Sequence, residues 1–312
     1  MVCHWSLAEE QRPASPRSQA HCQVRHRLIR TPASDPESEG TRQHAVHPLP
    51  KLVSASGNRR PSSVQVAGTN GKGSTCAFLE SVLVQAGIKV GVNTSPHLVS
   101  VTERIRVDGY DISESKFALY VTKVRKISEK LVESGELGGM PTFFEHITCI
   151  AQMVFADQGV EVAVLETGLG GRFDATTATE AEIVAITPIA LDHTKTLGDT
   201  IEKIASEKAA IIREGVKAVI GAQKADAIDV VLKKCDESNV SPKFATQVRT
   251  ASGSNLLNFK TPINRYEVTK LGLRGKHQIE NATVAVLLAE TLVDRGFIIS
   301  NSDVEKGLEK AV

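Results

Sequence analysis

Short apolar runs alternate along the chain with longer stretches in which apolar residues recur every three or four positions. The short runs cover residues 64–66, 88–93, 160–166, 182–188 and 217–221. The longer stretches cover residues 76–83, 113–134, 142–156, 199–213 and 278–294. Short buried runs predict strands, and a period near 3.6 residues predicts helices. Strands that alternate with helices predict an α/β fold with a mainly parallel sheet and helices on both faces.

Local signals mark several helix ends. The segment Thr142-Phe143-Phe144-Glu145 has the form of a capping box and predicts a helix that begins after Thr142. Gly135 and Gly215 follow two of the helical stretches, in the place where glycine commonly ends a helix. Residues 240–275 are less regular, and we expect residues 265–273 to form a hairpin at a sheet edge.

The first 60 residues differ in composition from the rest of the chain. They contain six of the twelve prolines, five of the nine histidines, the single tryptophan, and eight arginines against one lysine. They show no apolar periodicity, so we expect a disordered or targeting segment over residues 1–60. Arginine and serine are typical of organelle transit peptides, whereas the five acidic residues of this segment oppose that interpretation.

Bulk composition excludes several classes of protein. Hydrophobic residues make up 41% of the 312 residues and charged residues 23%, which is ordinary for a globular protein with a sizeable core. The formal net charge of +1 provides no basic footprint for nucleic acid. No apolar run reaches the roughly 20 residues of a membrane span, so we expect no membrane association. The five scattered cysteines lack a Cys-x-x-Cys pair and favour reduced thiols over disulfides or zinc.

A glycine-rich segment separates the first predicted strand from the first predicted helix. Glycines let backbone N–H groups turn toward an anion, and the helix N-terminus adds the positive end of its dipole. Lys72 would place a mobile charge at the β- and γ-phosphates of a nucleotide. Val66 occupies the first glycine position of the strict Walker spacing and Gly73 follows the lysine, so this is a variant loop. The residues expected to bind nucleotide are Gly68, Thr69, Asn70, Gly71, Lys72, Gly73, Ser74 and Thr75.

Polar segments follow three further predicted strands. They are Thr94-Ser95-Pro96-His97, the glycine-rich stretch that begins at Glu166, and Asp192-His193-Thr194. Ligands of open α/β sheets gather at the carboxyl ends of the strands, so these loops and the phosphate loop should converge on one edge.

Each candidate metal ligand on this edge has a structural alternative. Glu166 is a candidate Mg²⁺ ligand, because Mg²⁺ prefers oxygen, or else a partner of Arg172. Ser95 could supply a hydroxyl ligand or serve as a turn residue before Pro96, and His193 could bind a second Mg²⁺ or be a satisfied polar residue. Pattern favours an ordinary surface position for Lys208.

Taken together, these motifs resemble the folylpolyglutamate synthase and dihydrofolate synthase family, within the Mur-ligase-like ATP-dependent ligases. The resemblance covers about residues 64–295. The motifs that carry it are Gly68-Thr69-Asn70-Gly71-Lys72-Gly73-Ser74, Thr94-Ser95-Pro96-His97-Leu98 with Glu103-Arg104-Ile105-Arg106, the stretch from Glu166 to Thr176, Asp192-His193-Thr194 with Ser206-Glu207-Lys208-Ala209, and His277-Gln278-Ile279-Glu280-Asn281-Ala282.

The resemblance implies a role for each matching position. Lys72 and the loop glycines would hold ATP. Ser95 and Glu166 would bind one Mg²⁺, and His193 a second, shared with Glu166 and with Lys208, whose family equivalent is carbamylated. The residues expected to face the folate substrate are Ser95, Pro96, His97, Arg104, Thr142 and Phe144. Those expected at the adenine are His277 and Asn281.

The implied reaction joins L-glutamate to a folate or to dihydropteroate through an acyl phosphate formed with ATP. The partners are then the folate or dihydropteroate and L-glutamate, and the expected state is a monomer in the cytoplasm, with mitochondria or another organelle as the alternative.

The resemblance also implies a domain organisation. Residues 61–298 would form the ATP-binding catalytic domain and residues 299–312 a truncated tail. The family's second, Rossmann-like domain would follow, and its Trp-Pro-Gly-Arg-like and Asp-Gly-Ala-His-Asn-Pro-like motifs are absent from this sequence. The alternative function is a truncated, non-catalytic ATP- or folate-binding protein. A cell-wall Mur ligase fits the Ser-Pro-His-Leu loop less well, and a kinase would show the strict Walker spacing.

Overall fold

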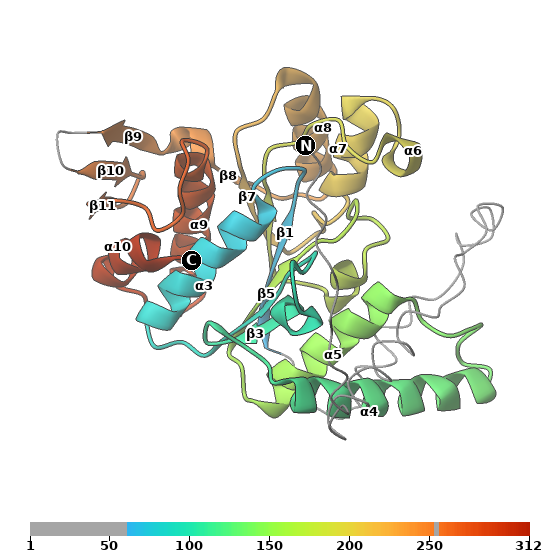
Figure 1. Cartoon of the computed structure of the whole chain (residues 1–312). Coiled ribbons are helices and arrows are strands. Elements are labelled where there is room, and N and C mark those ends of the chain that lie inside the picture. Colours follow the sequence, from blue (N-terminus) through green and yellow to red (C-terminus); the bar gives the residue numbers. More distant parts are fainter. Residues whose placement is uncertain (1–60, 253–255) are drawn as a thin grey trace, which may run out of the picture. The chain divides into compact units, whose positions relative to one another are not determined.

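The computed structural model describes residues 61–252 and 256–312 (Figure 1). The prediction of a disordered or targeting segment over residues 1–60 lies outside the described residues. Within the described ranges, no helix is long and apolar enough to cross a membrane.

An eight-stranded sheet forms the centre of the fold, in the order β4-β3-β2-β5-β1-β6-β7-β8. From β2 through to β8 each neighbouring pair is parallel, and the edge strands β3 and β4 are antiparallel to their neighbours. This confirms the predicted mainly parallel sheet. The strands are β1 (Ser62–Ala67), β2 (Val90–Asn93), β3 (Ile105–Val107), β4 (Tyr110–Asp111), β5 (Val162–Glu166), β6 (Ile183–Ile186), β7 (Lys217–Ile220) and β8 (Lys243–Phe244).

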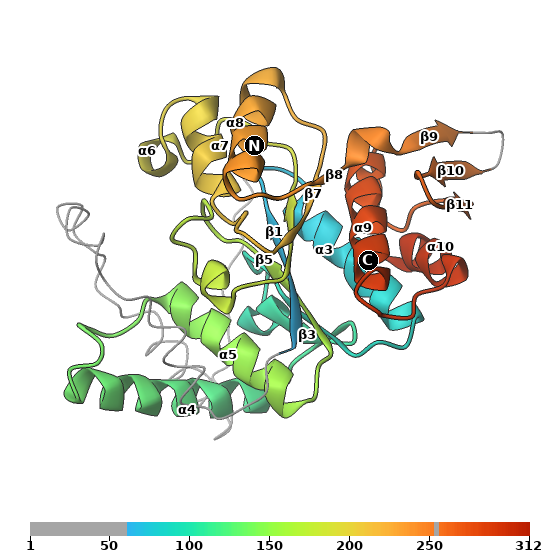
Figure 2. The ribbon, with the colours of Figure 1, turned by 180° about the vertical axis from the view of Figure 1, so that it is seen from behind.

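The alternation of side chains along the strands creates two cores, one on each face of the sheet. Val64 and Val66 of β1 point into the first core, together with the helices α3 (Lys72–Gln85), α9 (Gln278–Val293) and α10 (Asn301–Lys310). Figures 1 and 2 both show α3 beside α9 and α10. Ala67 lies in the second core, with α7 (Ile201–Ala209) and α8 (Ala225–Glu237). The predicted helices on both faces are therefore confirmed.

The remaining helices cover the second face near β2 and the loops at the sheet edge. The long helix α4 (Glu114–Glu133) packs on α5 (Phe143–Asp157), whose Phe155 ring lies against Gly91 of β2. The predicted capping box at Thr142 is present, because Thr142 and Glu145 exchange hydrogen bonds at the start of α5. The short elements are α6 (Thr194–Leu197) and the 3-10 helices η2 (Val101–Arg104), η3 (Ala175–Thr179) and η4 (Ala245–Gln247).

Residues 249–268 form a separate three-stranded antiparallel sheet instead of the hairpin expected at 265–273. It consists of β9 (Arg249–Ser252), β10 (Leu257–Lys260) and β11 (Arg265–Val268). The N–H groups of Glu267 and Thr269 donate to the carboxylates of Glu305 and Glu309 on α10, at 2.8 and 2.7 Å. These carboxylates occupy donors along the free edge of β11, and residues 269–273 form no strand.

The segment 299–312, expected to be a tail, contains α10 and packs into the first core. Ser300 caps this helix, and Val304 and Leu308 are buried. At Gly307, α10 approaches α3 so closely that a Cβ added to the glycine would lie 2.5 Å from Cα of Val82 on α3. The sequence pattern did not predict α10, because this helix is short and mostly polar and only its contact with α3 reveals its buried stripe. The helix α8 also went unpredicted.

The close approach at Gly307 gives a stability prediction. Gly307→Ala should lower the free energy of unfolding by about 1–3 kcal/mol, because the methyl group meets the helix backbone at Val82 as well as its side chain, and the backbone cannot move aside. This loss should appear although alanine favours a helix by about 1 kcal/mol over glycine. Chemical denaturation would measure it. Gly138→Ala is the control, since nothing lies within 4 Å of its added Cβ. Equal stability of the two variants would contradict the packing of α10 on α3.

Candidate functional site

Four loops meet at one edge of the sheet because their strands are neighbours in the order β2-β5-β1-β6. These four strands run parallel, so their carboxyl ends share an edge. The loops after β1, β2 and β6 carry the phosphate-loop residues, Ser95 and His193 in turn, and Glu166 is the last residue of β5. The predicted convergence of these segments is therefore present in the structure.

The loop between β1 and α3 has the shape of an anion cradle. Gly68 and Gly71 adopt positive φ angles of 144° and 86°, which favour glycine. Gly71 caps α3 without a side-chain hydrogen bond, and the first helical bond runs from Thr75 N to Gly71 O. The backbone N–H groups of the first turn are consequently free of a side-chain cap and point along the positive end of the helix dipole. This geometry suits a phosphate group.

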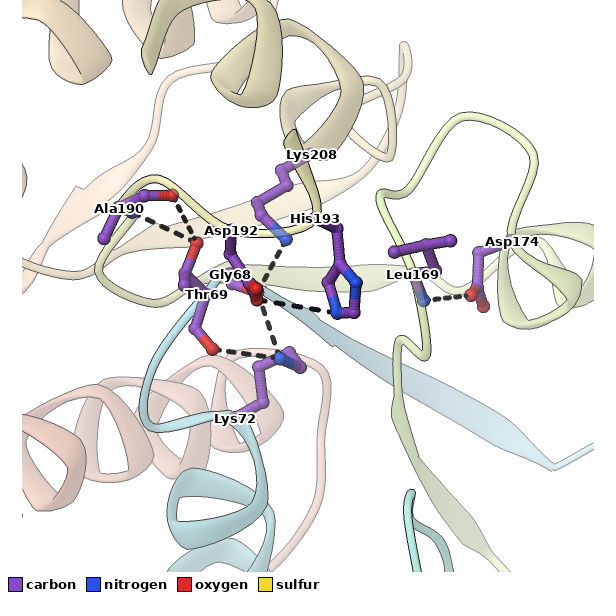
Figure 3. A network of polar contacts seen from close by, with 9 residues as sticks. All are labelled: Gly68, Thr69, Lys72, Leu169, Asp174, Ala190, Asp192, His193 and Lys208. Carbon is purple, nitrogen blue, oxygen red and sulfur yellow. Dashed lines mark hydrogen bonds and ion pairs between the residues drawn. The ribbon is translucent and has the colours of Figure 1, made fainter. Parts of the chain in front are cut away.

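Two lysine ammonium groups meet at the carbonyl oxygen of Gly68 (Figure 3). Lys72 Nζ donates to Gly68 O and Thr69 O, both at 3.1 Å, and Lys208 Nζ donates to Gly68 O at 2.9 Å. Lys208 is only 4% exposed, in contrast to the surface position that pattern favoured. Burial, together with the charge of Lys72, lowers the pKa of Lys208 to about 8. Two converging cations create a strong attraction for an anion at this point.

Glu166 ends β5 as a buried carboxylate close to the start of α3. Its Oε2 accepts a hydrogen bond from Ser95 N at 3.0 Å, and an added Cβ on Gly73 would lie 3.6 Å from its Oε1. Burial raises the pKa of Glu166, although Lys72 and two arginines oppose the shift. Among the described residues it forms no ion pair within 4.0 Å. A buried carboxylate without a bonded cation beside a phosphate cradle fits a Mg²⁺ ligand.

The other predicted metal ligands are less closely gathered. His193 is exposed and its Nε2 lies 3.7 Å from Asp192 Oδ2, so its contact is with its own neighbour in the chain (Figure 3). Ser95 reaches Glu166 through its backbone N–H and not through its hydroxyl. The described part of the chain contains no group of three His, Cys, Asp or Glu side chains arranged to hold a metal. A second Mg²⁺ at His193 and Lys208 thus stays a prediction.

Of the expected folate-facing residues, Arg104 and His97 contact each other, and Arg104 also lies near the start of α5. The guanidinium of Arg104 donates from Nε to His97 Nδ1 at 2.8 Å and lies 5.5 Å from the centre of the Phe143 ring. Burial lowers the pKa of Arg104, and the charge of Glu166 opposes this.

The other expected folate-facing residues have separate contacts. Thr142 caps α5, and the Phe144 ring packs directly against Gly168. Pro96 lies exposed between Ser95 and His97.

Asn281 and His277 lie at the start of α9, behind the phosphate loop. An added Cβ on Gly71 would meet the Asn281 side chain, so Asn281 supports the turn at Gly71. Its Nδ2 donates to Gln278 Oε1 at 2.8 Å, and His277 packs over Gly275. The predicted adenine contact of these two residues stays a prediction.

Two positioning carboxylates were missed as site residues in the sequence. Asp174 is buried and accepts hydrogen bonds from Gly168 N, Leu169 N and Thr176 N at 2.9–3.0 Å, which fixes the loop after Glu166. Glu103 accepts bonds from the backbone N–H groups of residues 98–100 at 2.6–2.9 Å. These bonds hold the pKa of Glu103 below its usual range. An acidic residue followed by small or hydroxyl residues, as at Asp174, was the available signal for such a cap.

Comparison with known proteins identifies the family of the chain. A family model described as the Mur ligase middle domain matches residues 66–289. The chain is 39% identical over 261 residues to a folylpolyglutamate synthase of Arabidopsis thaliana, covering 82% of this chain and 43% of that protein. It is 38% identical over 255 residues to a dihydrofolate synthase/folylpolyglutamate synthase of Bacillus subtilis, covering 79% and 59%. The chain thus spans about half the length of these relatives.

The structural comparison agrees. The fold superposes on a Mycobacterium tuberculosis folylpolyglutamate synthase, solved in complex with ADP and AMPPCP, with a TM-score of 0.79 and 31% identity, covering 95% of this chain and 66% of that one. The variant phosphate loop lies within the region that the family model matches. The chain therefore belongs to the Mur ligase middle-domain family, and its relatives there are folylpolyglutamate synthases and dihydrofolate synthases.

Proposed function

We propose that this chain provides the ATP-binding catalytic domain of a ligase that adds L-glutamate to a folate, to dihydropteroate, or to both. The observation that carries the proposal is the meeting of Lys72 and Lys208 at Gly68 O, beside the start of α3, with buried Glu166 nearby. The names of the two relatives support the choice of acceptor. The predicted monomeric state and compartment stay predictions.

The proposed reaction has two steps. A carboxylate oxygen of the acceptor attacks the γ-phosphorus of ATP, the bond to the β-γ bridging oxygen breaks, and ADP leaves. The glutamate amine then attacks the acyl carbon of the acyl phosphate, loses a proton, and expels inorganic phosphate. Both reactants of the first step are anions, so the attraction between Lys72, the α3 N-terminus and the phosphates must offset their repulsion.

Mg²⁺ would neutralise phosphate charge when bound, and Glu166 is the residue that fits it, with Ser95 beside it. His193 and Lys208 are the proposed residues of a second site. The low pKa of Lys208, about 8, supports carbamylation, because the neutral amine nitrogen is the form that attacks carbon dioxide. The adduct then loses a proton and becomes a carbamate, so an anionic oxygen donor would stand where the ammonium was.

On the acceptor side, Arg104 would bind the anionic or polar end of the substrate, and its planar guanidinium already lies over Phe143. The hydrogen bond from Arg104 to His97 fixes the loop after β2 against Arg104. The Phe144 ring, which packs against Gly168, would offer an aromatic face to the acceptor. Such a mixture of one cation and aromatic faces suits a pterin or aminobenzoyl group.

A ligation assay tests the proposal. The purified chain is incubated with Mg²⁺-ATP, bicarbonate, L-glutamate and either dihydropteroate or tetrahydrofolate, and mass spectrometry detects a product heavier by one glutamyl unit. Product formation supports the ligase and identifies the acceptor. Binding of ATP without product supports the non-catalytic nucleotide-binding alternative. Absence of both product and ATP binding overturns the proposal.

Lys72→Ala should weaken binding of an ATP analogue by on the order of a hundredfold, because it removes a cation held at the phosphate cradle. Isothermal titration with the analogue and Mg²⁺ would measure the dissociation constant. Lys126→Ala, an exposed lysine on α4, removes the same charge elsewhere and should leave binding unchanged. Similar dissociation constants for the two variants would contradict the assignment of Lys72.

Lys208 should affect stability with a specific pH dependence. Its folded pKa of about 8 lies below the usual value of 10.5, so the buried charge destabilises the fold below pH 8. The unfolded chain binds more protons between these two values, so that penalty disappears as the pH rises through them. In buffer free of carbon dioxide, Lys208→Met should therefore raise the free energy of unfolding at pH 7 by about 1–3 kcal/mol.

The stability difference between Lys208→Met and the unchanged protein should narrow from pH 8 to pH 10, as measured by chemical denaturation. Lys126→Met serves as the control and should show no such pH-dependent difference. A Lys208→Met variant that is less stable than the unchanged protein at pH 7 would show that the hydrogen bond to Gly68 O outweighs the burial of the charge.

A further inference from the structure

The loop after β7 contains Gln223, whose side chain forms three hydrogen bonds with the backbone at the end of β6 and in the loop that follows it. Its Nε2 donates to Ile186 O at 3.3 Å and to Thr187 O at 3.0 Å, and its Oε1 accepts from Ile189 N at 3.0 Å. The amide thus uses both donors and its acceptor on one short stretch of backbone. This stretch ends β6 and continues toward Asp192 and His193.

The same stretch of backbone bonds the phosphate loop on its other side. Pro188 O accepts from Thr69 N at 3.0 Å and from Asn70 N at 3.2 Å. Thr69 Oγ1 donates to Ala190 O and accepts from Ala190 N, both at 3.1 Å (Figure 3). The N–H groups of Thr69 and Asn70 are therefore committed to Pro188, and the N–H groups that remain for a phosphate are those at the start of α3.

The contact between the two loops leaves no free space. A Cβ added to Gly68 would overlap Thr187 Oγ1 and would lie 2.8 Å from Thr187 O. Thr187 in turn donates from N and Oγ1 to Ala67 O, at 2.8 and 3.2 Å. A displacement of residues 187–190 must therefore move Gly68, the residue whose carbonyl oxygen both lysines bind.

We propose that Gln223 is a positioning residue for nucleotide binding, which acts through residues 187–190 on Thr69 and Asn70 of the phosphate loop. The proposal rests on the proposed function insofar as the ligand is a nucleotide. Gln223 forms no hydrogen bond with the phosphate loop itself, so its effect passes through the loop after β6. Its partners are two carbonyl oxygens and one N–H group, a pattern that a neutral primary amide satisfies and a carboxylate does not.

Gln223→Glu tests this with almost no change of shape. The new carboxylate can still accept from Ile189 N but faces the carbonyl oxygens of Ile186 and Thr187 without a proton to donate. We expect on the order of tenfold weaker binding of an ATP analogue and faster hydrogen exchange of the Thr69 and Asn70 amides. Gln247→Glu makes the same chemical change at an exposed glutamine and should match the unchanged protein in both measurements.

A double-mutant cycle separates positioning from general destabilisation. Thr69→Val removes the hydroxyl that bonds Ala190, and Gln223→Met removes the amide without adding charge. If Gln223 acts through residues 187–190, the two losses of affinity are less than additive, because each frees the same contact. Gln223→Met also replaces Gln223→Glu if the latter does not fold.

Faster exchange confined to residues 187–190, Thr69 and Asn70, with weaker binding, supports the proposal. Unchanged exchange and affinity overturn it, and so does a uniform increase in exchange over the whole chain, which would indicate a structural role. If the unchanged protein binds no nucleotide, the proposed function fails, and exchange at Thr69 and Asn70 still decides whether Gln223 positions the loop.

Discussion

The carbonyl oxygen of Gly68 is shared by two ammonium groups that come from opposite faces of the sheet. Lys72 begins α3, which packs in the first core, and Lys208 belongs to α7, which packs in the second. Both helices must be docked on the sheet before the two charges can meet at one oxygen. The anion site is consequently a product of the complete three-layer packing of helices on both faces of the sheet and not of the glycine loop by itself.

Like charges held this close repel each other, and the fold compensates in two ways. Burial, together with the charge of Lys72, lowers the pKa of Lys208 to about 8, so part of its population gives up the proton near neutral pH. The backbone around the two lysines is also braced, because the loop after β6 bonds the phosphate loop at Thr69 and Asn70. The cradle is therefore held in shape before any phosphate arrives, which reduces the ordering that binding requires.

The sequence predicted those parts of the site whose signals are local. Glycines next to Lys72 identify a phosphate loop, and an apolar run that ends in Glu166 identifies a carboxylate at a strand end. Lys208 could not be found in this way, because its neighbours in the sequence include Glu207 and Lys203 and its burial arises from the packing of α7 on the phosphate loop. Glu103 was missed although Ser100 and Glu103 have the spacing of a capping box. Gln223 was missed because it bonds backbone groups of another loop, which no spacing in the sequence shows. The strands β3 and β4 are too short to produce a readable alternation.

The two carboxylates of α10 that accept hydrogen bonds from the backbone at β11 also affect the tendency of the protein to aggregate at high concentration. An open strand edge offers unpaired N–H groups on which a strand of a neighbouring molecule can grow. Here Glu305 and Glu309 already occupy the donors of Glu267 and Thr269. An incoming strand would have to displace both and place its own carbonyl oxygens beside two negative charges. At this edge of the three-stranded sheet, α10 thus opposes aggregation through strand pairing.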